Sequence, residues 1–330
     1  MRTLYVSRQG CYITLKGENL IIKQGETVHG EVQLPFLEQI LIFGKSQITT
    51  QAIRTCLWRD IPIAYLSRMG YCYGRLIPIT RGYRQLSRYQ QQLTADERLL
   101  VARKIVQGKL KNSRTFLQRQ QRRHPSQTTE IAIKSLEVLV QKAGEAETIE
   151  RLMGLEGAGA AQYFSAFGEC LNNPEFIFLA RTRRPPGNPV NAMLSFGYQI
   201  LWNHLLTLIE LQGLDPYHAC LHQGTERHAA LASDLIEEFR SPIIDSLVLW
   251  LVNTKVINTQ ADFEYHDGGC YLNNSGRQKY IKYFLQRLEE SVQDSTGEQQ
   301  PRWDLMTQQI KAFKNFVYQP NQTYQPYQIR

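Results

Sequence analysis

The stretch YCYGRLIPITRGYRQLSRYQQQLTADERLLVARKIVQGKL, residues 71–110, contains the point at which the spacing of the apolar residues changes. Up to residue 79 the chain has short runs of β-branched and aromatic residues, which are typical of strands. Beyond residue 82 the apolar residues recur about every 3.6 positions, which is typical of helices. One such stripe consists of Ala102, Val106, Leu110 and Leu117. We therefore predict a strand-rich domain, residues 1–79, and a helical domain, residues 80–330.

The strand-rich domain is predicted to contain a hairpin, because strands over residues 11–15 and 20–23 flank the turn Lys16-Gly17-Glu18-Asn19. Further strands are expected over residues 4–6, 39–43, 62–66 and 71–79. A short helix is expected over residues 46–59, with Ser46 as its cap. No cluster of titratable residues occurs in this domain, so we expect the chemistry to lie elsewhere.

The helical domain is predicted to have its buried centre in residues 191–211, which are apolar nearly all round. Other helices are expected over residues 131–153 with a break near Gly144, 156–171, 234–239, 242–253, 275–292 and 303–316. Residues 181–189 carry three prolines and three arginines, which predicts a loop that contacts phosphate. The tail, residues 319–330, has no apolar period, and we expect it to be loose or ordered only by a partner.

The charge of the chain favours a polyanionic partner, because the net charge is +8 and the pI is about 9.1. Twelve Lys or Arg and two acids lie between residues 81 and 123. Like charges at i,i+4 destabilise a helix unless an anion compensates them, although a solvated face explains any single cation equally well. The predicted DNA contacts are Arg103, Lys104, Lys111, Arg114, Arg183 and Arg184.

The chain has no run of 18 or more apolar residues and no signal-peptide pattern after Met1. We therefore expect a cytoplasmic protein without membrane contact. Its six cysteines are scattered, without the paired spacing of a disulfide framework or a thiolate zinc site. They are expected to be buried, reduced thiols.

Two motifs bring a carboxylate and imidazoles into the helical domain. Glu156 is expected at the start of a helix made of small residues, where the helix dipole or close packing would also explain it. His218 and His222 follow the turn Asp215-Pro216 and could share one helical face. A single histidine is more often a packing residue, so these motifs alone leave a structural explanation open.

A third motif places Asp234 one helical turn before Glu237 and Glu238, so that two carboxylates face one way. A solvated, capped helix start would explain this motif as well. Together, however, several carboxylates and one imidazole suit Mg²⁺ or Mn²⁺, which prefer oxygen ligands and keep positions open for water and phosphate. Such an ion acts as a Lewis acid on phosphorus oxygens.

Five motifs in a fixed order and spacing are more specific than any one of these motifs alone. They are Glu156-Gly-x-Gly-Ala-Ala-x-Tyr163-Phe164, Arg184-Pro185-Pro186, the segment PVNAMLSFGY of residues 189–198, Asp215-Pro216 leading to Leu221-His222, and Asp234-Leu235-x-Glu237-x-Phe239-Arg240. In this order they resemble the CRISPR-associated integrase and endonuclease of spacer acquisition, the Cas-one family, over nearly the whole chain.

The resemblance implies that Glu156, His222 and Glu237 ligate the metal and that Asp234 is an auxiliary acid. The link between His222 and Asp234 departs from the family, since the usual serine is absent and Arg227 takes the basic place. The implied fold is α+β, with a small N-terminal β-sandwich-like domain followed by a larger all-α domain that binds DNA.

The implied assembly is a homodimer formed through the N-terminal domains. Two dimers would clamp the small partner Cas-two around a DNA fragment, which makes a heterohexamer. The implied reaction is attack of the fragment's 3′-hydroxyl on a phosphodiester at each end of a CRISPR repeat, which inserts the fragment as a new spacer. Nuclease activity on double-stranded and branched DNA would follow from the same site.

Two other functions fit part of the pattern. The first is a non-catalytic helical scaffold that binds nucleic acid and whose acids are only helix caps. The second is a metallohydrolase of small phosphoesters, although cations spread over 40 residues argue against a compact pocket.

Overall fold

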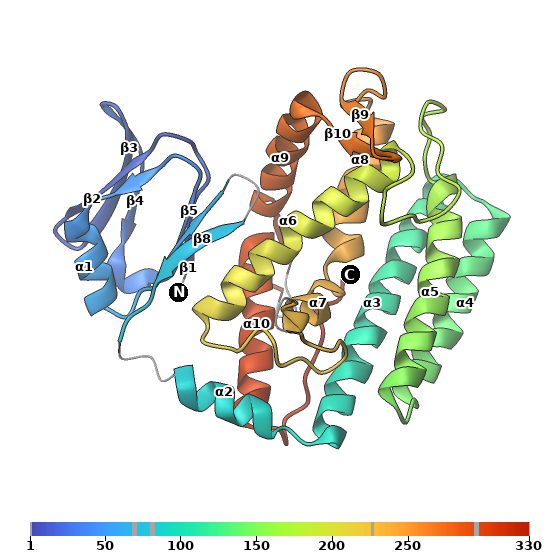
Figure 1. The fold of residues 1–330 in the computed structure, drawn as a ribbon, viewed down its shortest axis with the longest axis horizontal. Helices are drawn as coiled ribbons and strands as arrows, with labels where there is room; N and C mark the ends of the chain where they lie inside the picture. Colours follow the sequence, from blue (N-terminus) through green and yellow to red (C-terminus); the bar gives the residue numbers. More distant parts are fainter. Residues whose placement is uncertain (1, 68–70, 80–82, 226–227, 294–296, 330) are drawn as a thin grey trace.

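The computed structural model describes residues 2–67, 71–79, 83–225, 228–293 and 297–329. It has two four-stranded sheets at the N-terminus, followed by a helical domain (Figure 1). This arrangement confirms the α+β prediction. The helical domain is not purely helical, because it also carries two two-stranded hairpins. The predicted boundary at residue 79 adjoins residues 80–82, which lie outside the described residues, and it stays a prediction.

The first sheet has the order β1-β5-β7-β8, formed by Arg2–Val6, Leu37–Phe43, Ile63–Leu66 and Cys72–Leu76. The second has the order β4-β3-β2-β6, formed by Thr27–Gln33, Asn19–Gln24, Tyr12–Lys16 and Gln47–Ile48. The predicted hairpin is β2–β3, an antiparallel pair. The sequence prediction missed β4, an edge strand whose residues are mostly exposed and which therefore lacks an apolar period.

Strand β5 is buried on both of its faces and joins the two parts of the molecule. Ile40 and Ile42 pack in the core that the first sheet shares with the second sheet. Leu41 and Phe43, which point to the opposite face, belong to the core of the helical domain. The first sheet is therefore the middle layer of the fold.

The helix beside the sheets is shorter than predicted. It is α1, Thr50–Trp58, and its cap is Thr49, whose hydroxyl accepts the backbone N–H of Ala52 at 3.2 Å. Ser46 instead donates to the carbonyl of Arg8 at 2.8 Å and accepts the N–H of Cys11 at 3.1 Å. The expected cap was wrong because Ser46 serves a contact that is distant in sequence.

The helical domain contains α2 to α10. Their bounds are Tyr83–Gln92, Ala95–Arg123, Gln127–Gly144, Ile149–Glu169, Pro189–Leu211, Ala230–Ile236, Ser246–Asn253, Asn274–Glu289 and Arg302–Tyr318. A π-helical segment, Arg240–Asp245, precedes α8. The hairpins are Phe263–His266 with Gly269–Leu272, and Ser291–Gln293 with Gln299–Pro301. Helices α3, α4 and α5 lie side by side, and α6 crosses the middle of the domain (Figure 1).

Helix α6 is the buried centre, as predicted, because most of its side chains are buried. Two other expectations need correction. The break near Gly144 is real, but α5 begins at Ile149 under the cap of Thr148 and continues through Glu156. The tail is not loose: Tyr324 and Pro326 are buried against the same chain.

All six cysteines are free; five of them are buried, as expected, whereas Cys72 is half-buried. Within the part of the chain that the structure describes, no helix is long and apolar enough to cross a membrane.

We expect stability to fall between pH 6.5 and 4 because of His204 on α6. Its ring is buried among Phe43, Trp303 and Phe284, and burial lowers its pKa to about 4. The ring bonds to the carbonyl of Ile200 through Nδ1 at 2.8 Å, while Nε2 is buried without a hydrogen bond. The unfolded chain therefore gains a proton below pH 6.5 that the folded chain accepts only near pH 4.

This linkage costs about 3 kcal/mol of unfolding free energy once the pH is below 4. Urea titrations at pH 7, 6 and 5 measure it, and His204→Phe serves as the comparison because it has no titrating ring. The stability difference between the two proteins should change with pH in that window. A constant difference would contradict the assignment to His204.

Candidate metal centre

Glu156 lies within α5 rather than at its start, so the helix dipole does not explain it. The small residues that follow it bring α5 close to α3. A Cβ added to Gly159 would lie 2.2 Å from Cδ2 of Leu110 on α3, so a side chain there would separate the helices. The close packing offered as one explanation of the small residues is therefore present, and it also places the Glu156 carboxylate against α3.

Lys109 of α3 lies between two of the predicted ligands. Its Nζ forms ion pairs with Glu156 and, at 2.6 Å, with Oε2 of Glu237. The lysine side chain is 11% exposed, so these contacts are largely shielded from water. Lys109 was not predicted as a site residue, because it is one of twelve cations in its segment and lies far in sequence from both carboxylates.

Glu237 follows the end of α7 and is 3% exposed. Its second oxygen, Oε1, pairs with Arg240 at 2.9 Å. Burial by itself raises the pKa of Glu237, but the charges of Arg240 and Lys109 outweigh it and lower that pKa to about 2. The group is therefore a carboxylate at neutral pH, in a place where two cations already surround it.

His222 does not share a helical face with His218, because residues 217–225 form a loop. Asp234 of α7 shapes this loop. Its carboxylate accepts the N–H groups of Cys220, Leu221 and His222 at 2.7, 2.9 and 2.9 Å, and it bonds Nδ1 of the His222 ring at 2.8 Å. Burial lowers the pKa of His222, but the hydrogen bond and charge of Asp234 turn the net shift upward. Asp234 therefore orients the ring, with Nδ1 facing it.

The third motif was expected to place two carboxylates on one side of a helix, with exposure to water as one explanation. The structure does not show this arrangement. Asp234, Glu237 and Glu238 are all buried and have separate partners. Glu238 accepts the N–H of Tyr327 at 2.7 Å and the hydroxyl of Tyr324, both in the C-terminal tail. Burial raises the pKa of Glu238 to about 8. The explanation of a solvated helix start is therefore wrong.

The donor chemistry fits a divalent metal, although the ligands do not all meet at one point. Within the described residues, no three His, Cys, Asp or Glu side chains are grouped so that they could hold one ion. Glu156 and Glu237 do converge on a single cation, the Lys109 ammonium. A histidine whose Nδ1 is held by a carboxylate, as in His222, has the usual arrangement for ligation through Nε2. A metal bound by Glu156 and Glu237 would therefore either share these two carboxylates with the Lys109 ammonium or take its place.

Of the six predicted DNA contacts, two are occupied within the protein. Arg103 donates to the carbonyl of Ala146 at 2.6 Å, and Arg114 pairs with Glu137 at 2.9 Å. Lys104 and Lys111 are half-buried on α3, whereas Arg183 and Arg184 are exposed in the loop before α6. None of the six contacts is tested by the structure, and all remain predictions.

Arg183 also lines a small pocket next to Lys109 and Arg240, over Gly159 and Tyr163 of α5. Arg240 lies 4.6 Å from the ring of Tyr198, whose hydroxyl donates to Asp245. The carboxylates of the centre thus adjoin a pocket lined by three cationic side chains and one acid, Asp245, which leaves cations in excess for an anionic ligand.

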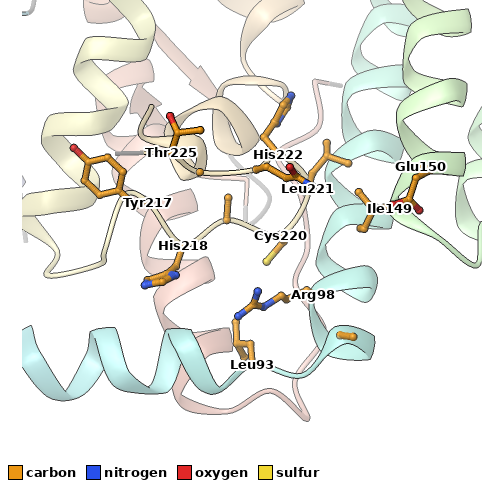
Figure 2. Close-up of a pocket in the computed structure, with 14 residues that line it drawn as sticks. Leu93, Arg98, Ile149, Glu150, Tyr217, His218, Cys220, Leu221, His222 and Thr225 are labelled. Carbon is orange, nitrogen blue, oxygen red and sulfur yellow. The ribbon is translucent and has the colours of Figure 1, made fainter. Parts of the chain in front are cut away.

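A larger groove of about 980 Å³ lies beside the His222 loop. The start of α3, the start of α5 and the loop line it (Figure 2). The Arg98 side chain, on α3, lines the groove, and the ring of His222 points away from the groove. The groove therefore borders the backbone that carries His222.

The fold is that of a CRISPR-associated protein. The family described as "CRISPR associated protein Cas1" matches residues 4–286. The chain belongs to this Cas1 family, which confirms the resemblance seen in the motifs.

Named relatives agree with this membership. The chain is 34% identical over 313 residues to a "CRISPR-associated endonuclease Cas1 1" of Thermus thermophilus, covering 94% of this chain and 95% of the relative. It is 35% identical over 300 residues, 88% of its length, to a Cas4 exonuclease/Cas1 endonuclease fusion of Geobacter sulfurreducens. The chain spans about half of that fusion, 53% of its length.

A solved structure has the same fold over the whole chain. It is a chain of the "Partial Cas6-RT-Cas1--Cas2 complex", with a TM-score of 0.84 and 26% identity, and the match covers 100% of this chain and 99% of the other.

Proposed function

We propose that this chain is a metal-dependent DNA endonuclease and integrase that inserts DNA fragments into a CRISPR array as new spacers. The observation that carries the proposal is the convergence of Glu156 and Glu237 on one cation beside the Asp234–His222 pair, in a member of the Cas1 family. Relatives named Cas1 endonucleases support the activity.

The proposed ligands are Glu156, His222 and Glu237, with Mg²⁺ or Mn²⁺ as the ion. When bound, such an ion polarises the phosphodiester and lowers the pKa of an attacking hydroxyl or water. The low pKa of Glu237 keeps its carboxylate charged for this purpose. Asp234 orients the His222 ring through Nδ1. Arg240 pairs with Oε1 of Glu237, so that carboxylate would contact both the arginine and the metal.

Lys109, Arg183 and Arg240 are proposed to bind the phosphate next to the reacting bond, because they line one pocket beside the carboxylates. Their charges would stabilise the negative charge that builds up on phosphorus oxygens. The DNA is double-stranded or branched, and its 3′-hydroxyl is the nucleophile. Attack by the fragment's 3′-hydroxyl would form a new phosphodiester and release the 3′-hydroxyl of the cut repeat strand, so no covalent intermediate with the protein is needed.

The proposed assembly is a homodimer formed through residues 1–79, with residues 80–330 as the catalytic and DNA-binding domain. Two dimers and the small protein Cas2 would make the heterohexameric integration complex. The matched solved structure, which is named as a complex of Cas1 with Cas2, supports that partner. The proposed location is the cytoplasm.

The test is a strand-transfer assay with a labelled fragment, a repeat-containing plasmid, the Cas2 partner, and Mg²⁺ or Mn²⁺. We expect joined product with metal and none after chelation. A matched fragment that ends in a 3′-dideoxynucleotide should not be joined, because it lacks the nucleophile. A chain that binds DNA tightly but never joins or cleaves it would favour the alternative, a non-catalytic nucleic-acid-binding scaffold.

We expect Arg183→Gln and Arg184→Gln to weaken binding of all DNA sequences alike. Each exposed guanidinium that contacts phosphate releases a counterion, so each loss should lower the slope of log K against log salt by about 1. Fluorescence anisotropy at several salt concentrations measures this slope. Arg59→Gln is the control, since Arg59 pairs with Glu18 in the N-terminal region. An unchanged slope would remove the substituted arginine from the set of contacts.

A further inference from the structure

The C-terminal residues 322–329 cross the middle of the helical domain without helix or strand. Tyr327 and Ile329 lie against α3 and the turn that follows α7, in the middle of the view in Figure 1. The residues form a strap, because they run between two elements that carry the proposed metal centre. These elements are α3, with Lys109, and the turn of residues 237–239, with Glu237.

The strap binds the turn through buried polar groups. The Glu238 carboxylate, which is 0% exposed, accepts the N–H of Tyr327 at 2.7 Å and the hydroxyl of Tyr324. The ring of Phe239 stacks on that of Tyr327, with 5.2 Å between centroids. Two tied carboxylates therefore flank Glu237: Asp234, three residues earlier on α7, holds the His222 loop, and Glu238, the next residue, holds the strap.

The strap also binds α3, one turn beyond Lys109. Asn112 is 1% exposed, and its Nδ2 donates to the carbonyls of Tyr327 at 2.9 Å and Glu238 at 2.8 Å. Its Oδ1 accepts the N–H of Ile329 at 3.0 Å. This single amide therefore links helix, turn and strap, and its burial makes each unmade bond costly.

The packing at α3 leaves no spare room. A Cβ added to Gly108, the residue before Lys109, would lie 2.6 Å from Cβ of Pro326 and 3.1 Å from its Cγ. Two heavy carbon atoms cannot approach that closely, so a side chain at position 108 would displace the strap or the helix. Gly108 lies inside a helix, where glycine is unfavourable, and the strap explains its presence.

We infer that residues 322–329 are a positioning strap for the metal centre: they hold the Glu237-bearing turn against α3 and so set the distance from Glu237 to Lys109 and Glu156. This role rests on the proposed function of that site. None of the strap's residues is proposed to touch DNA or metal. They act through the placement of Glu237, in the way that outer partners orient metal ligands.

The test uses Mn²⁺ binding to the full-length chain, measured from the free-ion signal in electron paramagnetic resonance. Gly108→Ala should weaken Mn²⁺ binding about tenfold, the usual effect of losing an outer partner. Pro326→Gly removes the atoms that the new Cβ would meet, so adding it to Gly108→Ala should restore binding to within about twofold of Pro326→Gly alone. Asn112→Ala should weaken binding as well.

Ile13→Ala is the structural control, because Ile13 is fully buried in the core of the two sheets. It should lower the melting temperature and leave Mn²⁺ affinity unchanged. Unchanged affinity in Gly108→Ala, or a loss that persists undiminished with Pro326→Gly, would overturn the strap. A wild-type chain whose Mn²⁺ binding does not depend on Glu156 would instead overturn the proposed function, so the two failures are distinguishable.

Discussion

Glu156→Gln or Glu237→Gln should lower metal-dependent DNA joining about a thousandfold while DNA binding is kept. Each substitution preserves the shape of the side chain and removes the negative charge that attracts a cation. Metal catalysis supplies several kcal/mol of transition-state stabilisation, and each 1.4 kcal/mol is a factor of about ten in rate. Single-turnover joining rates, at saturating DNA and with Mg²⁺ or Mn²⁺, measure the loss.

Glutamine is preferred to alanine at position 237, because alanine would leave Lys109 and Arg240 without their buried partner and could unfold the site. Glu147→Gln is the matched control, since Glu147 is exposed in the turn before α5. It should join DNA at the wild-type rate. Joining within tenfold of wild type in both Glu156→Gln and Glu237→Gln would contradict the ligand assignment.

Asp234→Asn should destabilise the protein by about 3 kcal/mol and lower joining by about a hundredfold. Four donors converge on the two oxygens of Asp234, three of them backbone N–H groups of residues 220–222. An asparagine has one acceptor oxygen, and its NH₂ group would face N–H donors that the second carboxylate oxygen now binds. Some of these buried N–H groups would therefore lose their hydrogen bonds. The His222 ring also loses the carboxylate that orients it, which usually costs 10- to 100-fold in metal affinity or activity.

Urea unfolding and the same joining assay measure the two effects. The chain contains a matched control in the exposed pair His266–Asp267, whose Nδ1–Oδ2 distance is 3.1 Å. The Asp267 side chain is 90% exposed, so Asp267→Asn should change neither stability nor joining by much. Equal effects of the two substitutions would show that burial of Asp234 is not what makes it important.

The local pattern of the sequence predicted much of the fold. The change of period near residue 80 separated strands from helices, and the nearly continuous apolar run of residues 191–211 predicted the buried helix α6. These predictions held because strand and helix periods are properties of neighbouring residues. The misplaced start of α5 and the misplaced cap of α1 show the limit, since several polar residues near each helix end could have served as the cap.

The sequence by itself determined which residue types were available for the centre: Glu156, His222, Asp234 and Glu237 stand in motifs that are local in the chain. Tertiary structure decided what surrounds them. Lys109 meets Glu156 because α5 packs closely on α3, and it meets Glu237 because the turn after α7 also packs on α3. Glu238 is covered by the tail, which returns to it from far along the chain. No periodicity encodes such contacts, because ion pairs and hydrogen bonds between distant segments depend on how whole helices pack.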